Sequence, residues 1–189
     1  YEIATMFAGG KTLSLPLREE DAWLPNLDAV SNEDAIRARL LWLNYPNNPT
    51  GAVYDKKTLK ELVQVAAENN LYILCDEIYD KIIFDEEFVS IAKYADEVPL
   101  IMLNGFSKVF LMTGLRLGYM CMNGNSKALD DLRQNIPKLA RVRIASNTPV
   151  QKAAIEALSG TDEHIKDMIN KLRVRRDYMM KRLDTIERI

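Results

Sequence analysis

Short apolar stretches alternate with longer amphipathic ones along this chain of 189 residues. Residues 40–44, 71–75, 100–103 and 118–122 have the length and the apolar character of strands buried on both faces. Amphipathic stretches lie between them, as in proteins whose helices cover a mostly parallel sheet on both sides. The pattern therefore predicts an α/β fold with three layers, α/β/α.

The helical positions follow from apolar residues that recur every three or four places. In residues 55–69, for example, Leu59, Leu62, Val63 and Ala66 fall on one helix face. Similar patterns predict helices over residues 28–39, 126–140, 149–158 and 163–189, and a further strand over 11–17. The last helix has an apolar stripe beside a charged face, so we expect it to pack along the domain by one side.

Composition narrows the class of protein. Hydrophobic residues make up 48% and charged residues 28%, and the net charge of −2 gives no reason to expect a nucleic acid or an anionic membrane as partner. No apolar run is long enough to span a bilayer. Cys75 and Cys121 lie in apolar runs without the spacing of a metal site, which predicts buried, reduced thiols and a cytoplasmic protein.

Polar residues of particular kinds follow three of the predicted strands. Asn48, Asp76 and Lys108 each come shortly after an apolar run. Because right-handed crossovers bring the carboxyl ends of parallel strands to one edge, where ligands of open α/β sheets bind, we expect one pocket to collect all three. Taken singly, each has an ordinary explanation: a turn, a helix cap or a solvated lysine.

Together these residues suggest the chemistry of the pocket. Lys108 can supply an amine for a Schiff base, and Arg116, eight residues further on, can clamp a phosphate. A nucleotide-binding Rossmann domain is disfavoured, because no Gly-x-Gly-x-x-Gly follows a strand.

Several longer motifs carry a family resemblance. The chain resembles the large domain of a fold-type I, pyridoxal-phosphate-dependent aminotransferase of class I/II. The matching segments are Asn48-Pro49-Thr50-Gly51, Asp76-Glu77-Ile78-Tyr79, Ser107-Lys108 with Thr113-Gly114-Leu115-Arg116, and Ser146-Asn147-Thr148-Pro149 with Gln151. The resemblance implies that residues 1–160 belong to the cofactor-binding domain and that residues 161–189 lead towards a smaller domain.

The resemblance also assigns catalytic roles. Lys108 would hold pyridoxal 5'-phosphate covalently and shuttle a proton at the substrate α-carbon. Asp76 would pair with the pyridine nitrogen, and Tyr79 and Asn48 would donate hydrogen bonds to the phenolic oxygen of the cofactor.

Phosphate binding would fall to Arg116 and, as a further ligand, to Ser107. The commonest family pattern has serine three residues before the lysine, where this chain has Gly105. That variant resembles the alanine-aminotransferase branch. Val142 stands where the aspartate-specific branch has an arginine, so strict dicarboxylate recognition of that kind is not expected.

The resemblance implies transamination between an L-amino acid and a 2-oxo acid, with alanine and 2-oxoglutarate as one candidate pair, in a protein that forms a homodimer. Two alternatives stay open: a β-lyase on the same scaffold, and a non-catalytic α/β binding module. The family places a ring-stacking aromatic residue upstream of Tyr1 and the arginine for the substrate α-carboxylate downstream. The chain alone is therefore expected to be inactive and to bind the cofactor weakly.

Overall fold

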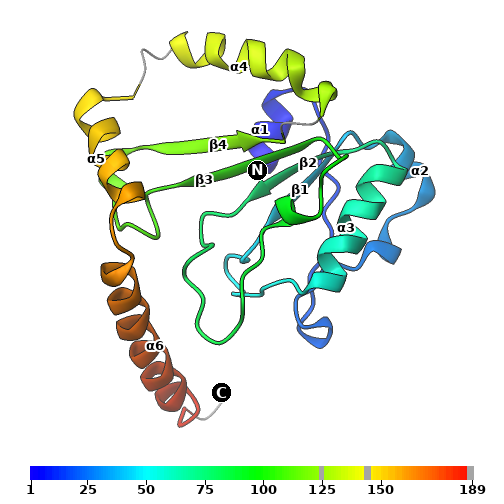
Figure 1. Cartoon of the computed structure of the whole chain (residues 1–189). Helices are drawn as coiled ribbons and strands as arrows, with labels where there is room; N and C mark the ends of the chain where they lie inside the picture. The colour runs from blue at the N-terminus through cyan, green and yellow to red at the C-terminus, as the bar shows by residue number, and fades with distance from the viewer. Residues whose placement is uncertain (124–125, 143–145, 187–189) are drawn as a thin grey trace.

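A four-stranded sheet forms the centre of the computed structural model, which describes residues 1–123, 126–142 and 146–186 (Figure 1). The strand order is β1-β2-β3-β4. The first three strands are parallel, and the fourth runs antiparallel to β3. The predicted α/β class with a mostly parallel sheet is confirmed. The strands are β1 (Leu40–Asn44), β2 (Tyr72–Asp76), β3 (Leu100–Gly105) and β4 (Gly118–Met122).

Helices precede, connect and follow these strands. α3 joins β1 to β2 and lies beside the sheet, while α4 passes over β4 and α6 leads away from the sheet (Figure 1). The helices are α1 (Glu2–Phe7), α2 (Asn32–Arg37), α3 (Lys56–Glu68), α4 (Asp130–Val142), α5 (Thr148–Ser159) and α6 (Glu163–Leu183). Within the described residues, no helix is both long enough and apolar enough to cross a membrane.

The hydrophobic core lies between α3 and one face of the sheet. Alternate side chains of a strand point to the same face, and those of β1 and β2 that point towards α3 are buried. Asp55 starts α3, since its Oδ1 accepts a hydrogen bond of 2.8 Å from the amide of Thr58. The main contributors to this core are Leu41, Leu43, Leu59, Leu62, Ala66, Ile73, Cys75, Ile91 and Leu100.

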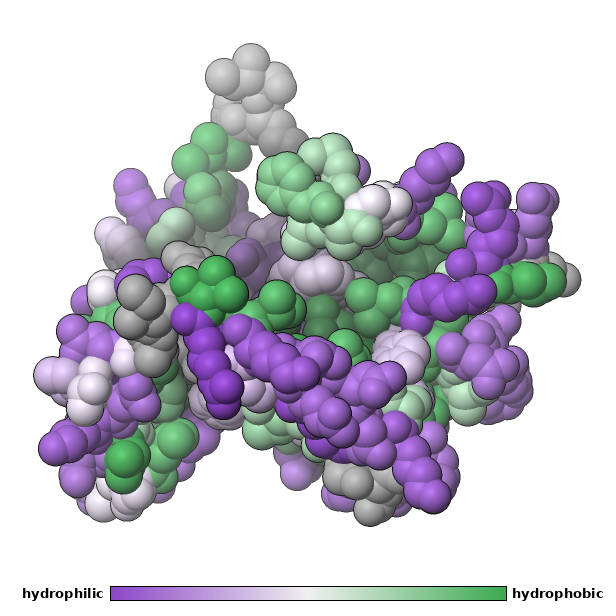
Figure 2. Space-filling model, turned by 90° about the horizontal axis from the view of Figure 1, so that it is seen from above, coloured by the Kyte–Doolittle hydropathy of each residue, from purple (hydrophilic) through white to green (hydrophobic). Residues whose placement is uncertain are grey.

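The far edge of the sheet is less covered than the sequence predicts. Tyr119 and Met120 of β4 are 37% and 42% exposed, and Cys121 is exposed as well. Seen from above, the molecule is hollowed, and apolar residues lie between polar ones around the hollow (Figure 2). The expectations that every strand is covered on both faces and that Cys121 is buried were therefore wrong. An apolar sequence predicts a strand whose faces can be buried. Whether they are buried depends on whether another segment packs against them.

Two further elements differ from the prediction. Residues 11–17 form no strand, because no neighbouring strand pairs with them and Pro16 has no N–H to donate. The helix predicted over residues 28–39 is a 3-10 turn, Leu27–Ala29, followed by the shorter α2. Ser31 begins α2, because its side chain accepts a hydrogen bond from the amide of Asp34.

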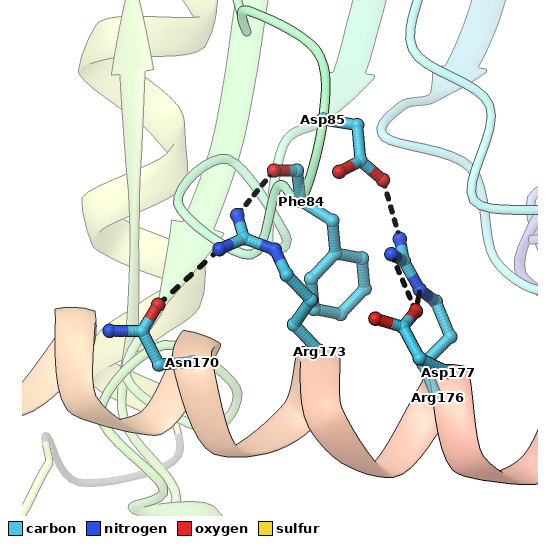
Figure 3. A network of polar contacts seen from close by, with 6 residues as sticks. All are labelled: Phe84, Asp85, Asn170, Arg173, Arg176 and Asp177. Carbon is cyan, nitrogen blue, oxygen red and sulfur yellow. Dashed lines mark hydrogen bonds and ion pairs between the residues drawn. The ribbon is translucent and has the colours of Figure 1, made fainter.

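α6 is tied to the loop that follows β2. Arg173 donates a hydrogen bond to the carbonyl of Phe84, and Arg176 pairs with Asp85 at 2.6 Å and lies 4.6 Å above the Phe84 ring (Figure 3). We predicted that one side of α6 packs against the domain. This is confirmed for the first half of the helix, where Ile165 is buried. In the second half, Val174, Tyr178, Met179, Met180 and Leu183 are exposed. Residues 187–189 of the predicted helix lie outside the described residues.

Candidate functional site

A pocket of about 370 Å³ lies where β1, β2 and β3 end. This volume falls within the range of roughly 300–1,000 Å³ that is usual for sites of small molecules. All six residues predicted from the sequence to bind the cofactor line it. The lining residues are Tyr1, Asn44, Asn48, Asp76, Ile78, Tyr79, Ser107, Lys108, Thr113 and Arg116.

The loop after β1 brings Asn48 to the pocket. Asn44, the last residue of β1, accepts a hydrogen bond of 3.0 Å from the amide of Asn48 through its side-chain oxygen. Gly51 has a φ of +77°, a conformation that favours glycine and lets the loop turn back towards α3. The side-chain amide of Asn48 then lies 3.4 Å from the hydroxyl of Tyr79 and donates a hydrogen bond to it. Side chains from the β1 and β2 loops thus meet directly.

Asp76 ends β2, and both of its carboxylate oxygens accept hydrogen bonds. Oδ1 accepts from the amide of Ile78 at 3.2 Å, and Oδ2 accepts from the hydroxyl of Tyr1 at 2.7 Å. The first bond ties the side chain to the turn that carries Tyr79, and the second ties it to the start of the chain. The carboxylate is therefore held from two directions while it lines the pocket.

Lys108 enters the pocket from the segment that follows β3. Phe106 and Val109 on either side of Ser107-Lys108 are buried and anchor this segment. The Nζ atom of Lys108 lies 5.6 Å from the centre of the Tyr79 ring, so the amine from β3 and the phenol from β2 are neighbours. Lys108 and Asp76 line the same pocket, as a single cofactor site requires.

Gly105 stands where the commonest family pattern has serine, and the space around it is tight. A Cβ atom at Gly105 would lie 3.1 Å from the Cα of Gly118 and 3.2 Å from the carbonyl oxygen of Leu117. Both distances are tighter than most Cβ contacts, because the last residue of β3 lies close to the first residue of β4. A side chain at this position would have to displace backbone.

Arg116 reaches the pocket through an unusual backbone conformation. Its φ of +54° is left-handed and follows the 3-10 turn Thr113–Leu115. One guanidinium nitrogen, Nη1, donates a hydrogen bond of 2.8 Å to the carbonyl of Thr113. A guanidinium has five N–H donors in a planar fork, so this contact orients the group and leaves donors for an anion.

Tyr1 lines the pocket, although the aromatic residue of the site was expected further upstream. The Tyr1 ring packs against Trp42 with 4.5 Å between centroids. Burial, and then the hydrogen bond to the Asp76 carboxylate, raise the pKa of the Tyr1 hydroxyl well above its usual value. Tyr1 thus stays a hydrogen-bond donor across the physiological range. No periodicity or motif within the chain marks this role.

The charges of the pocket suit an anionic ligand that also has a basic ring nitrogen. Lys108 and Arg116 bring two positive charges, and Asp76 brings one negative charge. An anionic group is stabilised near the guanidinium, and a protonated heterocycle near the carboxylate. The segment 146–151 begins α5 and does not line the pocket, although Gln151 there donates a hydrogen bond to the Ser146 carbonyl at 2.6 Å.

The fold and the site define the class of protein. The family model for aminotransferases of class I and II matches residues 1–189, and the chain belongs to this family. Members of the family use pyridoxal phosphate as cofactor.

Individual relatives agree with this assignment. The chain is 36% identical over its whole length to half of a probable aspartate aminotransferase of Methanocaldococcus jannaschii. It is 39% identical over 85% of its length to 40% of the glutamate-pyruvate aminotransferase AlaA of Escherichia coli. The chain thus spans about half the length, or less, of these relatives.

Solved structures show the same likeness. The alanine aminotransferase of Pyrococcus furiosus superposes with a TM-score of 0.89 at 40% identity, over 96% of this chain and 46% of that one. An aromatic aminotransferase of Pyrococcus horikoshii gives a TM-score of 0.85 at 33% identity, over 97% of this chain and 49% of that one.

Proposed function

We propose that the protein in which this chain stands transfers an amino group between an L-amino acid and a 2-oxo acid, with pyridoxal phosphate as cofactor. The observation that carries the proposal is the meeting of Asn48, Asp76, Tyr79, Ser107, Lys108 and Arg116 in one pocket. Family membership supports it independently. The chain is about half as long as its relatives, so the activity is proposed for the whole protein.

The residues of the pocket fit each functional group of the cofactor. Lys108 is the amine for the aldehyde, and Asp76 is the carboxylate for the ring nitrogen. Tyr79 and Asn48, which are already hydrogen-bonded to each other, offer donors for the phenolic oxygen. The phosphate would be held by the charged fork of Arg116 and by the hydroxyl of Ser107.

The chain's own residues would divide the work between binding and proton transfer. The bound cofactor supplies a ring that withdraws electrons from the substrate α-carbon. Asp76 holds a proton on the ring nitrogen, which strengthens that withdrawal. The amine of Lys108 would take the proton from the substrate α-carbon as a positioned general base. Its Nζ atom lies 5.6 Å from the centre of the Tyr79 ring, and both residues line the pocket.

We further propose alanine with 2-oxoglutarate as the substrate pair. The likeness to proteins named alanine aminotransferase and glutamate-pyruvate aminotransferase supports this choice. Gly105, where a Cβ would be tightly packed, supports it as well, because glycine at this position resembles the alanine branch.

Covalent labelling tests the site. The protein is incubated with pyridoxal phosphate and reduced with borohydride, and the modified peptide is mapped. Labelling at Lys108, lost in Lys108→Arg, is the expected result, and labelling at another lysine would overturn the assignment. Product analysis tests the reaction: the amino group should appear on the added 2-oxo acid. Pyruvate and ammonia formed without an acceptor would instead indicate a β-lyase.

We also propose a cytoplasmic homodimer. The free thiols of Cys75 and Cys121 fit a reducing compartment. The exposed apolar side chains of β4 and α4 fit a subunit contact. Light scattering on the full-length protein and cell fractionation test the two parts separately.

A further inference from the structure

A side-chain hydrogen bond joins the two segments that carry the tyrosine and the lysine of the site. Asp80 directly follows Tyr79, and Asn104 precedes Lys108 by four residues at the end of β3. The side-chain amide of Asn104 donates a hydrogen bond of 3.0 Å to Oδ2 of Asp80. We call this Asp80–Asn104 pair the tether. Neither residue lines the pocket.

Further hydrogen bonds hold both ends of the tether in place. Oδ1 of Asp80 accepts from the amide of Lys81 at 2.8 Å, so each carboxylate oxygen has its own donor. The side-chain oxygen of Asn104 accepts from the amide of Gly105 at 2.7 Å. Each side chain is thus bonded once to the other and once to its own backbone. This pattern fixes the two backbones relative to each other.

Burial makes this arrangement costly to disrupt. Asn104 is 9% exposed and Asp80 is half-buried. Burial raises the pKa of the Asp80 carboxyl, and the hydrogen bond from Asn104 opposes that rise. A buried polar group that loses its partner retains the full cost of its desolvation. The two side chains therefore depend on each other.

The tether extends the sheet pairing beyond the end of β2. The last backbone contact of β2 with β3 on this side is the amide of Glu77 donating to the carbonyl of Leu103 at 2.9 Å. The tether lies three residues further along the first segment. Between the two contacts, Ile78 packs against Gly105, since its Cδ1 atom is 3.3 Å from where a Cβ of Gly105 would stand.

We propose that the tether positions the Tyr79 hydroxyl relative to the Lys108 amine. Asp80 and Asn104 are positioning residues: they act on the pocket through the backbone to which Tyr79 and Lys108 belong. The inference rests on the proposed function, because those two groups have to address one cofactor ring from different segments. Loss of the tether would let the turn after β2 shift away from the segment after β3.

Exchanging the two residues changes both side chains but keeps the hydrogen bonds of the tether. The exchange therefore tests whether the hydrogen bonds, and not the individual residues, are what matters. In the double variant Asp80→Asn with Asn104→Asp, the amide and the carboxylate change places. The new amide at position 80 would donate to the new carboxylate at position 104. The backbone amides of Lys81 and Gly105 would still find a side-chain oxygen at each position, so all three hydrogen bonds survive the exchange. The single variant Asn104→Asp instead places two carboxylates face to face.

The experiment measures the affinity for pyridoxal phosphate and the steady-state constants of the full-length protein. Asn104→Asp should weaken cofactor binding on the order of tenfold and lower kcat more than it raises KM for the amino acid. The exchanged variant should return to within about threefold of the unmodified protein. Asn135→Asp, which adds a carboxylate at an exposed asparagine of α4, is the matched control for the added charge.

Hydrogen exchange without cofactor gives a second readout. Peptides that contain the amides of Lys81 and Gly105 should lose protection in Asn104→Asp and regain it in the exchanged variant. If Asn104→Asp does not fold, Asp80→Ala, which removes the acceptor of the tether, takes its place in the comparison. The tether is overturned if the exchanged variant performs no better than the single variant that lacks the tether, while labelling at Lys108 persists. An unmodified protein that is not labelled at Lys108 overturns the proposed function, and the tether's role with it.

Discussion

The hydroxyl of Tyr1 donates a hydrogen bond of 2.7 Å to Oδ2 of Asp76, the carboxylate proposed to face the ring nitrogen of the cofactor. The Tyr1 ring is itself held against Trp42. Asp76 thus cannot rotate freely at the end of β2, because its other oxygen is bound to the amide of Ile78. Tyr1 fixes the direction in which this carboxylate presents its charge.

Tyr1→Phe tests this contact, because it removes the hydroxyl and keeps the ring. A hydrogen bond to a charged group contributes about 1.5–3 kcal/mol, so the affinity for pyridoxal phosphate should fall about tenfold or more. The melting temperature should change little, since the contact with Trp42 remains. Fluorescence titration of the full-length protein measures the affinity, and Tyr178→Phe is the control at an exposed tyrosine. Unchanged affinity in Tyr1→Phe would remove this role.

Gly105→Ser would introduce the residue that the commonest family pattern has at this position. Because a Cβ there meets the backbone of Gly118 and Leu117, we expect a loss of about 1–3 kcal/mol of stability and no gain in cofactor affinity. Denaturant unfolding and cofactor titration measure the two effects. Gly114→Ser is the control for the unfolding measurement, since a Cβ there meets nothing within 4 Å. A serine at this position that binds the cofactor more tightly would contradict this account.

Glu77 is a carboxylate 1% exposed, and its Oε1 accepts hydrogen bonds from Ser90 and from the amide of Ile91. Glu77→Ala should cost about 2–4 kcal/mol, because both buried donors lose their acceptor. Glu77→Gln keeps an acceptor oxygen and should cost much less. Denaturant unfolding measures both losses. Equal losses in the two variants would show that the volume of the side chain matters more than its acceptor.

The pH dependence of Glu77 has a definite sign. Burial raises the pKa of its carboxyl, so the folded state keeps this proton to a higher pH than the unfolded state does. Stability from this group is therefore greatest below the pKa of an unfolded glutamate and falls as pH rises through the folded pKa. Glu77→Gln should flatten that part of the stability curve, measured by urea unfolding between acid and neutral pH.

Alkaline pH should destabilise the fold through a buried tyrosine. Burial raises the pKa of Tyr54 from 10.0 to about 12. Between these values the unfolded state releases a proton that the folded state keeps, so unfolding becomes easier by about 1.4 kcal/mol per pH unit. Tyr54→Phe should reduce the slope of unfolding free energy against pH by that amount. A slope that Tyr54→Phe leaves intact would assign the alkaline loss to other groups.

Arg176→Ala tests the contact between α6 and the loop after β2. The variant loses the ion pair with Asp85 and the contact over the Phe84 ring, which are exposed to solvent, so we expect only a small loss of stability. Hydrogen exchange should rise in residues 81–88. Arg175→Ala, an exposed neighbour on the same helix, is the control. Equal effects in both variants would indicate a change in the helix itself.

The core of the fold and the pocket follow from short-range features of the sequence. Buried strands leave uninterrupted apolar runs, and the side chains of Asp76 and Lys108 come at or shortly after the ends of two of those runs. The sequence did not reveal the exposure of β4, because exposure depends on what lies opposite the strand.

Contacts between distant residues were beyond prediction for a related reason. Asp80 and Asn104 are 24 positions apart, and Asp85 and Arg176 are 91 positions apart. No repeating pattern links residues at such separations. The contact of Tyr1 with the site was not predicted for the same reason, since its partner Asp76 lies 75 positions away.

α6 also has a mechanical consequence. Its 21 residues make a rod about 31 Å long. Lys81 pairs with Asp162 just before the rod begins, and Arg176 pairs with Asp85 well along it. These two ion pairs join α6 to the loop after β2, so a movement of the helix would also move that loop. Because Lys81 comes two residues after Tyr79, a displacement of α6 would also act on the segment that carries Tyr79 to the pocket.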